Sequence, residues 1–322
     1  MLGSKDVSLL HDFAVVCREG NLTRAARELN TVQSAVTQRM KRLEDAMGTR
    51  LLKRHSRGVT PTEQGQILLR YARKLNTLVA DATAEVGAWE ASPSGAVSIG
   101  LPPSVSTVLT SPLIEAVKTA LPNVELTVAE AFSGYLSGWL ENDEIDLGFV
   151  FDRAPGPRTM VSPLMREELY LITLPETARR LPAALGIGDL CSLSLVGPSR
   201  RHGLRRDLET AAEAAGRALD IVLEVDAGYQ LIRQVLRGVG SCVLARSAVM
   251  PELQDGTLAA VPISNPRMRR TVCLARKREK SDSYLLARIE ETLKTVVTEL
   301  VEGQKWPGEL VTEQTSPLPS PR

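Results

Sequence analysis

Polar side chains gather at the start of a predicted helix over residues 32–47, and their types suit contact with DNA. Amides and hydroxyls can bond to base edges, while lysine and arginine bind phosphates. Arg54 and Arg57 occupy a short predicted hairpin just after this helix, which favours a DNA-binding surface over an ordinary solvated helix face. The predicted DNA contacts are Thr23, Thr31, Gln33, Ser34, Thr37, Gln38, Lys41, Arg54 and Arg57.

A second group of polar residues follows two predicted strands, at 102–106 and 197–202. Ligands of open α/β sheets collect at the carboxyl ends of strands, where helix N-termini offer free N–H groups. These two segments are therefore predicted to clamp a small anionic effector, and the alternative is plain loop chemistry and helix capping. The predicted effector contacts are Pro103, Ser104, Ser106, Ser199, Arg200, Arg201 and His202.

Patterns for catalysis are missing from the sequence. It contains no phosphate-binding loop, and Gly238 and Gly240 lack the third glycine of a dinucleotide motif. The three histidines fall in separate segments without metal-ligand spacing. We therefore expect a protein that is not an enzyme and needs no cofactor or metal. The widely spaced cysteines are interpreted as structural thiols, with a redox sensor as the alternative: Cys17, Cys191, Cys242 and Cys273.

Composition places the 322 residues among ordinary globular proteins, with 43% hydrophobic and 24% charged residues. Residues 1–62 carry 11 Lys and Arg against 6 Asp and Glu, whereas residues 63–322 carry 28 against 32. A basic N-terminal segment followed by an acidic remainder is typical of a protein whose first domain binds a polyanion. Neither a membrane span nor a signal peptide is evident, so a cytoplasmic location is expected.

Helical periodicity predicts helices over 6–19, 23–30 and 32–47, followed by a small hairpin over 51–60. Thr23 is the expected N-cap of the second helix and Thr60 that of a long fourth helix reaching Trp89. Its apolar residues follow a heptad pattern, which favours a dimer seam over packing on its own domain. The predicted seam comprises Leu68, Ala72, Leu75, Val79, Ala82, Val86 and Trp89.

Strand-like and helical runs alternate beyond the linker at 91–95, which predicts parallel sheets with covering helices in two α/β lobes. The final segment is rich in proline, glycine, serine and threonine and is predicted to be disordered. The predicted organisation is a winged helix-turn-helix domain at 1–62, a linker and dimerisation helix at 63–91, a two-lobed regulatory domain at 92–302 and a disordered tail at 303–322.

The N-terminal motifs resemble those of the LysR-type transcriptional regulators. They include Gly20-Asn21-Leu22-Thr23, Ala25-Ala26, Gln33-Ser34-Ala35-Val36-Thr37, Arg57-Gly58-Val59 and Thr60-Pro61-Thr62-x-x-Gly65. Further matches, among them Gly95-x-Val97-x-Ile99-Gly100 and Gly238-Val239-Gly240, extend the likeness to about residue 301 and are similar to the nitrogen-assimilation-control branch. Val32 departs from the Ser or Thr that often caps the family's recognition helix, and Thr31 is the expected substitute.

This resemblance implies an all-α winged helix-turn-helix with a linker helix, followed by two Rossmann-like lobes of periplasmic-binding-protein type around an effector cleft. It also implies a homodimer or homotetramer that binds double-stranded promoter DNA, responds to a small molecule and contacts RNA polymerase. A constitutive DNA-binding regulator whose α/β domain only oligomerises is one alternative. A two-lobed solute-binding or catalytic protein with an incidental basic head is the other.

Overall fold

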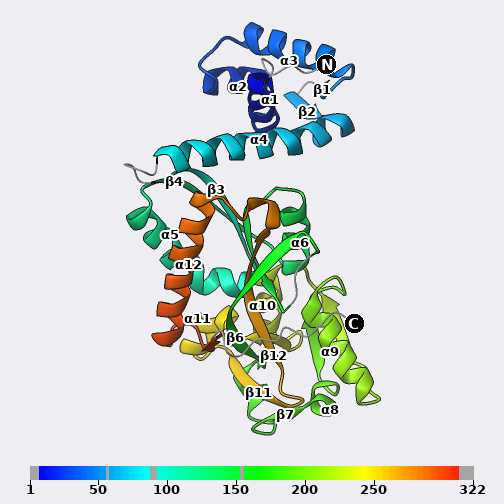
Figure 1. Ribbon diagram of the computed structural model, residues 1–322. Helices are drawn as coiled ribbons and strands as arrows, with labels where there is room; N and C mark the ends of the chain where they lie inside the picture. Colours follow the sequence, from blue (N-terminus) through cyan, green and yellow to red (C-terminus); the bar gives the residue numbers. More distant parts are fainter. Residues whose placement is uncertain (1–6, 56–57, 88–92, 153–155, 312–322) are drawn as a thin grey trace. The chain divides into compact units, whose positions relative to one another are not determined.

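The computed structural model describes residues 7–55, 58–87, 93–152 and 156–311. Contacts divide the chain into two units, Met1–Trp89 and Glu90–Arg322 (Figure 1). Each unit has its own apolar core, and each is described by itself below. No helix in these ranges is long and apolar enough to span a bilayer.

The first unit is a helical domain with a small hairpin. The apolar faces of its first three helices enclose a core that includes Phe13, Val36 and Leu43, all fully buried. Gly48, in the left-handed conformation, ends the third helix as the sequence predicts. The elements are α1 (Val7–Glu19), α2 (Leu22–Glu28), α3 (Gln33–Met47), β1 (Leu52–His55), β2 (Gly58–Pro61) and α4 (Glu63–Gly87).

Helices α2 and α3 are not capped by the predicted threonines. The side chain of Asn21 accepts hydrogen bonds from the backbone N–H groups of Thr23 and Arg24, so Asn21 rather than Thr23 is the N-cap of α2. Val32 stands at the N-cap of α3, where no side chain bonds to the free N–H groups. The prediction that Thr31 caps this helix is therefore wrong.

The predicted wing is confirmed as the antiparallel pair β1 and β2. The backbone N–H of Val59 donates to the carbonyl of Gly20, over 2.9 Å, which ties the wing to the turn between α1 and α2. A Cβ at Gly58 would lie only 2.1 Å from that carbonyl oxygen, and the φ of Gly58 is +138°. Only glycine fits this contact without a backbone shift.

Helix α4 begins at Glu63, later than expected, because Pro61 ends strand β2. The hydroxyl of Thr62 accepts from the N–H of Gly65 over 3.0 Å. Thr60 pairs with Lys53 in the hairpin. Thr62 therefore caps the helix, and the prediction of Thr60 as the cap is wrong.

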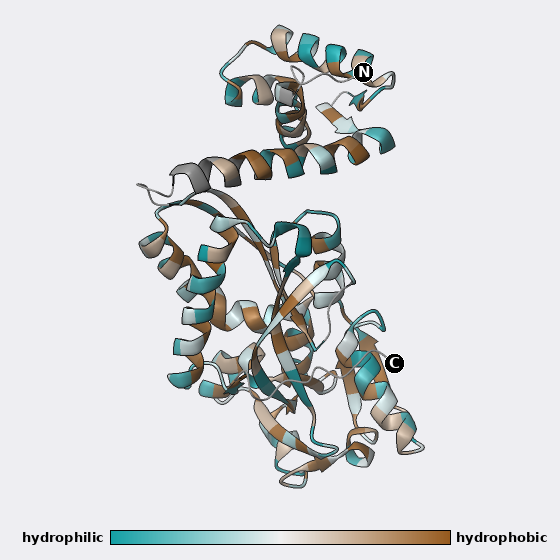
Figure 2. Ribbon diagram, viewed as in Figure 1, coloured by the Kyte–Doolittle hydropathy of each residue, from teal (hydrophilic) through white to brown (hydrophobic). Residues whose placement is uncertain are grey.

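The apolar seam predicted along α4 splits between two roles. Leu68 and Ala72 are buried in the core of their own unit. Ile67, Tyr71, Leu78 and Val79 are at least half exposed, and the hydropathy colouring shows apolar residues along this helix (Figure 2). The exposed apolar residues thus include Val79 of the predicted seam, together with three residues that the predicted seam omits. Trp89 and the predicted wing contact Arg57 lie outside the described residues.

The second unit is built on one mixed sheet with the order β4-β3-β5-β12-β6-β11-β7, in which β10 and β13 also pair with β6. Strands β8 and β9 form a separate parallel pair. Its strands are β3 (Ser94–Leu101), β4 (Asn123–Glu130), β5 (Leu147–Phe151), β6 (Thr159–Thr173), β7 (Leu185–Gly186), β8 (Ser194–Gly197), β9 (Asp220–Glu224), β10 (Cys242–Ala245), β11 (Ala259–Asn265), β12 (Arg269–Lys277) and β13 (Glu309–Leu310).

Helices cover these strands, and the unit consists of two lobes, each with its own apolar core. The predicted two-lobed α/β architecture is therefore confirmed. Lobe I contains α5 (Pro103–Ala120), α6 (Ser133–Glu141) and α12 (Tyr284–Glu302). Lobe II contains α7 (Pro175–Ala178), α8 (Ile187–Leu190), α9 (Gly203–Ala214), α10 (Gly228–Leu236), the 3-10 turn η2 (Arg246–Val249) and α11 (Met250–Gln254). The turn η3 (Arg278–Lys280) follows β12.

Strand β6 belongs to both lobes. Its residues 159–168 pair antiparallel with β12 in lobe I, and its residues 169–173 lie between β10 and β11 in lobe II. The sequence predicts only the second of these stretches, as the strand 169–174. Parallel pairing, which the alternation predicts throughout, holds for β3 with β4 and β5, for β7 with β11 and for β8 with β9. The pairs of β12 with β5 and of β6 with β10, β11 and β12 are antiparallel.

Residues 303–311, which follow α12, are ordered, so the prediction of disorder is wrong for them. Trp306 is fully buried, and β13 pairs with β6. Burial of a large aromatic ring and the pairing of two strand residues stabilise a segment whose composition suggests a loop. Residues 312–322 lie outside the described residues.

Candidate DNA interface and effector cavity

One face of α3 carries the polar residues predicted to contact DNA. Its inner face is buried, and its outer face presents amide, hydroxyl and ammonium groups to solvent. Figure 2 colours several residues of this helix as hydrophilic. Such groups can reach base edges and phosphates when a helix enters the major groove. The exposed predicted residues on α3 are Gln33, Ser34, Gln38 and Lys41.

Two contacts fix α3 against its neighbours. The Arg39 guanidinium lies 3.0 Å from the carboxylate of Asp12 on α1. Glu44 accepts from the backbone N–H groups of Leu51 and Leu52, over 2.8 and 3.1 Å, which sets the start of the wing. The polar face of α3 and the wing are thereby held in one geometry.

The remaining predicted DNA contacts differ in their surroundings. Thr23 and Arg54 are exposed, at the start of α2 and on β1, whereas Thr31 is half-buried. Thr37 is also half-buried, and its hydroxyl donates to the carbonyl of Gln33 over 2.9 Å. Lys53 is an exposed cation of the wing that the prediction omitted, although its place beside Arg54 was the available clue.

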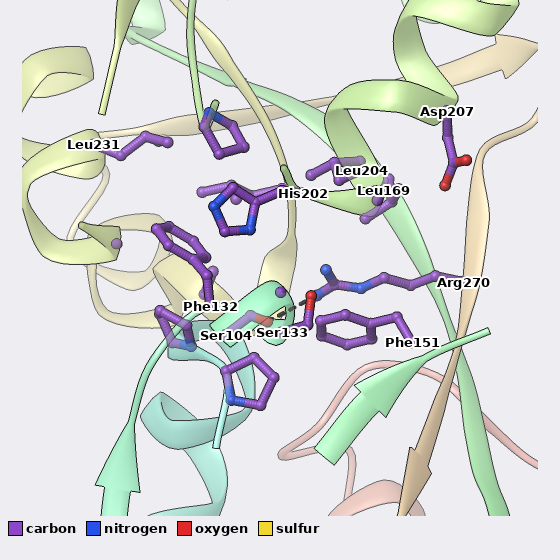
Figure 3. Close-up of a pocket in the computed structure, with 18 of the residues that line it drawn as sticks. Ser104, Phe132, Ser133, Phe151, Leu169, His202, Leu204, Asp207, Leu231 and Arg270 are labelled. Carbon is purple, nitrogen blue, oxygen red and sulfur yellow. Dashed lines mark hydrogen bonds between the residues drawn. The ribbon is translucent and has the colours of Figure 1, made fainter. Parts of the chain in front are cut away.

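A cavity of about 890 Å³ lies between the two lobes (Figure 3). Lobe I contributes the start of α5, the start of α6 and the end of β5, and lobe II contributes the starts of α9 and α10. A Cβ at Gly228 would lie 2.5 Å from Pro103, and one at Gly134 would lie 3.3 Å from the carbonyl of Arg201. Both glycines therefore allow close approach of the lobes around the cavity.

The structure brings four of the seven predicted effector residues to this cavity, namely Pro103, Ser104, Arg201 and His202. The other three have partners elsewhere. The Ser106 hydroxyl lies 3.1 Å from that of Thr110, within the same helix. Arg200 donates to Glu209 on the outer face of α9, over 3.0 Å.

Ser199, the third residue outside the lining, orients an acid beside the cavity. Its backbone N–H and hydroxyl donate to the two oxygens of Asp226, over 2.8 and 2.7 Å. One of these oxygens lies 3.2 Å from Nε2 of His202. The imidazole is 3% exposed, and neither ring nitrogen has a partner in hydrogen-bond geometry.

Arg270 is the main cavity residue that the sequence did not reveal. It is 8% exposed at the start of β12, and its Nε donates to Glu167 on β6 over 2.7 Å. Its Nη2 donates to the hydroxyl of Ser104 over 2.8 Å, and its guanidinium lies 3.7 Å from the ring centroid of Phe151. A buried guanidinium with a carboxylate partner and a ring to stack on is stable in an apolar site.

Glu167 connects this cation to the C-terminal segment. Beside Arg270, it accepts hydrogen bonds from the hydroxyl of Ser247 at 3.1 Å and from the indole of Trp306 at 3.0 Å. The carboxylate is 2% exposed. Its oxygens are therefore satisfied by protein donors.

The thiols of the described residues are free and poorly suited to redox chemistry. Burial raises the pKa of Cys17 and of Cys273 to about 12. Burial also raises the pKa of Cys191 and of Cys242. Because the thiolate is the reactive form, these shifts favour the structural interpretation over a redox sensor.

Two family models match this chain and together cover both units. Residues 7–66 match the bacterial regulatory helix-turn-helix protein of the lysR family, and residues 90–298 match the LysR substrate binding domain. The chain belongs to the LysR family. It is a DNA-binding transcriptional regulator with an effector-binding domain, and the family's regulators are not enzymes.

Named LysR-family relatives match over most of their length. The chain is 29% identical to the HTH-type transcriptional regulator BbuR of Bordetella bronchiseptica, covering 94% of this chain and 93% of the relative. It is 28% identical to the nitrogen assimilation regulatory protein nac of Klebsiella aerogenes, covering 89% and 93%. The second match agrees with the branch that the sequence motifs resemble.

Solved LysR-type structures share the fold. A full-length variant of OxyR from Pseudomonas aeruginosa superposes with a TM-score of 0.73 at 22% identity, covering 90% of this chain and 94% of that one. Full-length CbnR, solved in complex with its target DNA, superposes with a TM-score of 0.64 at 21% identity, covering 90% and 99%.

Proposed function

We propose that a small-molecule effector bound in the cavity between the two lobes switches promoter binding or activation by this regulator. The observation that carries the proposal is the cavity of about 890 Å³, lined from both lobes and holding buried polar groups. Enclosed pockets of this size with a few converging polar groups are typical of small-molecule sites.

Binding between the lobes would alter their relative orientation, because a ligand that contacts both lobes favours the arrangement that it fits best. Strand β6 is continuous through both lobes, so the change would bend that strand. A ligand-dependent preference for one arrangement is the coupling that regulation requires.

The effector would carry an anionic group, because Arg201 and Arg270 line the cavity and the first turn of α5 begins there. Helix N-termini and guanidinium groups both favour anions. The support comes from Arg201, Arg270 and Ser104 rather than from Arg200, whose guanidinium is held by Glu209.

A second copy of the chain is proposed to cover the exposed stripe Ile67, Tyr71 and Leu78 of α4, which would make the regulator a homodimer or a homotetramer. Their spacing of four and seven residues suits a helix-to-helix contact. Promoter DNA would be bound in the cytoplasm, with RNA polymerase as a further partner.

The test is a metabolite screen by thermal melting of the full-length protein, followed by footprinting on a promoter that it binds. A true effector raises the melting temperature, because it binds the native state alone. It should also change the footprint or transcription. Stabilisation without any change in footprint or transcription would overturn the switch and favour a constitutive DNA-binding regulator whose α/β domain only oligomerises.

A further inference from the structure

The serine and threonine side chains that line the cavity in the described residues all come from lobe I. They belong to α5 and α6: Ser104, Thr107, Ser133 and Ser137. The hydroxyls of Thr107 and Ser137 donate to carbonyls of their own helices, over 2.9 Å each. Ser104 and Ser133 lie in the same part of the cavity as Arg270 (Figure 3), and these three residues form its polar end.

Arg270 and Ser133 supply hydrogen-bond donors that a ligand can reach. The Nε and Nη2 of Arg270 are engaged by Glu167 and Ser104, but no described residue accepts a hydrogen bond from its Nη1 or from the hydroxyl of Ser133. Neither atom is among the fully enclosed polar atoms of the described residues that lack a partner, so both keep accessible surface. A guanidinium N–H beside a hydroxyl is a suitable site for a carboxylate.

The first turns of α5 and α6 add partial positive charge at the polar end, and the first residues of both helices line the cavity. No side chain caps the start of either helix, whereas α4 is capped by Thr62 and α12 by Ser283. The free N–H groups at a helix start are equivalent to about half an elementary charge. A ligand carboxylate there would supply the acceptors that a capping side chain supplies in the other two helices.

Lobe II contributes an apolar wall, formed by Leu204 on α9, Ile232 on α10 and Leu244 on β10. Each of the three packs on a core of lobe II and is only half-buried, so part of its apolar surface is left to the cavity. The charged residues that this lobe adds to the lining are exposed, apart from the half-buried Glu252: Arg201, Arg206, Asp207 and Arg267. A ligand with a hydrocarbon body would remove the apolar wall from water, which stabilises the complex.

Asp152 restricts the ligand to one anionic group. It is half-buried at the end of β5, it lines the cavity, and its Oδ1 accepts from the N–H of Thr271 over 2.7 Å. Burial raises the pKa of Asp152, while Thr271 and Arg270 act against the shift. Glu167 already balances the charge of Arg270, and no second buried guanidinium or ammonium group lines the described part of the cavity. A second ligand carboxylate would therefore add negative charge beside Asp152 without a buried cation to balance it.

We propose that the effector is an amphipathic monocarboxylate. Its single carboxylate accepts from Nη1 of Arg270, from the hydroxyl of Ser133 and from the free N–H groups at the starts of α5 and α6. Its hydrocarbon body, an acyl chain or an aromatic ring, packs on the apolar wall of lobe II. This inference rests on the proposed function and defines the ligand of the same cavity more closely.

The test compares matched probes on the full-length protein by thermal melting. Linear carboxylates from acetate to octanoate are assayed beside benzoate, with hexanamide and adipate as the neutral and the dianionic counterparts of hexanoate. Affinity should rise about threefold to fourfold with each added methylene. Hexanamide and adipate should bind at least tenfold more weakly than hexanoate. Benzoate that binds more tightly than hexanoate would support the inference and assign the body to an aromatic ring.

Three results of this comparison would overturn the inference. The first is adipate or hexanamide binding as tightly as hexanoate, which would remove the requirement for a single carboxylate. The second is an affinity that does not rise from acetate to octanoate, which would remove the apolar wall from recognition. The third is a lack of stabilisation by every acid of the series.

Substitutions on the two sides of the cavity separate recognition from a structural role. Ile232→Ser removes part of the apolar wall, so the advantage of hexanoate over acetate should fall at least fivefold. Ser133→Ala removes a donor to the carboxylate and should weaken all the acids by a similar factor, about tenfold. Val222→Ser, at an exposed residue of β9 outside the lining, is the control for the wall. Equal losses for acetate and hexanoate in a folded Ile232→Ser protein would overturn the role of the wall.

The probe comparison on the unsubstituted protein stands alone if Ile232→Ser does not fold. Footprinting then distinguishes the two levels of the hypothesis. Adipate or hexanamide that binds best and changes the footprint would refute the monocarboxylate class and leave the switch intact. Hexanoate or benzoate that binds as expected without changing footprint or transcription would refute the switch and leave the ligand class intact.

Discussion

The polar face of α3 and the cavity between the lobes are built in opposite ways. The first uses neighbouring residues of one helix, from Gln33 to Lys41, with side chains in solvent. The second joins residues far apart in sequence, such as Ser104 and Arg270, whose hydrogen bond spans 166 positions. Each exposed group contributes to binding largely independently of its neighbours, whereas the contribution of a buried polar group to stability depends on the partners that satisfy it. Substitutions in the first region should change binding, and those in the second should also change folding.

The largest effect is expected at Glu167. Glu167→Ala leaves the buried Arg270 cation without its carboxylate and removes the acceptor of Trp306, which should cost about 3–5 kcal/mol of unfolding free energy. Urea denaturation measures it. Glu28→Ala, at an exposed carboxylate paired with Arg18, is the control and should cost under about 1 kcal/mol. Similar losses for the two variants would remove the contrast between the regions.

A smaller loss is expected at the wing. Gly58→Ala places a Cβ 2.1 Å from the Gly20 carbonyl at a φ of +138°, so the turn must shift. We expect a loss of about 2 kcal/mol or more in thermal unfolding, with weaker DNA binding. Gly48→Ala is the matched control, because its Cβ meets open space at a φ of +67°, and should cost only about 1 kcal/mol. A harmless Gly58→Ala would show that the wing is not held by this contact.

Lys41→Ala should alter DNA binding and leave stability unchanged. Loss of one phosphate contact lowers the slope of log affinity against log salt by about one unit. Gel shifts at several salt concentrations measure the slope, and thermal melting should not move. Lys118→Ala on α5, an exposed lysine of the second unit, is expected to leave the slope as it is. An unchanged slope for Lys41→Ala would show that Lys41 does not contact a DNA phosphate.

The smallest effect is a gain in stability at the start of α3. Val32 gives no side-chain cap and is 65% exposed, so Val32→Ser should stabilise the protein by up to about 1 kcal/mol. Asn21→Ala removes an existing cap from α2 and should destabilise it by about 1 kcal/mol. Opposite shifts in melting temperature are expected, and a destabilising Val32→Ser would mean that the apolar contacts of Val32 outweigh a cap.

Local sequence patterns predicted the DNA-binding unit well, because its geometry depends on neighbours in the chain. Helical periodicity, Gly20 and Gly48 located the helices and their ends. The caps at Asn21 and Thr62 were missed because adjacent residues of suitable chemistry compete for each position. The first part of the seam predicted along α4 is not available to a partner, because the core of its own unit takes up Leu68 and Ala72, whereas Val79 further along is exposed.

Much less of the cavity could be predicted, because it depends on pairing between distant strands. The alternation of strands and helices indicated two lobes, but it predicted parallel pairing, whereas β6 and β12 are antiparallel. Arg270 and Glu167 are register partners in that pair, and only the pairing brings them together. Pro103, Ser104, Arg201 and His202 reach the cavity as predicted because they follow strand ends, whereas the outward direction of Arg200 follows from Glu209.

The ordered segment after α12 has a practical consequence for anyone who shortens this protein. A regulatory domain cut after residue 302 would lose Trp306 and β13, and with them one hydrogen-bond donor to Glu167 and an edge partner of β6. An empty hole the size of an indole would remain where the ring is fully enclosed. Expression of the isolated domain should therefore extend at least to Val311, whose backbone N–H donates to the carbonyl of Leu164 on β6.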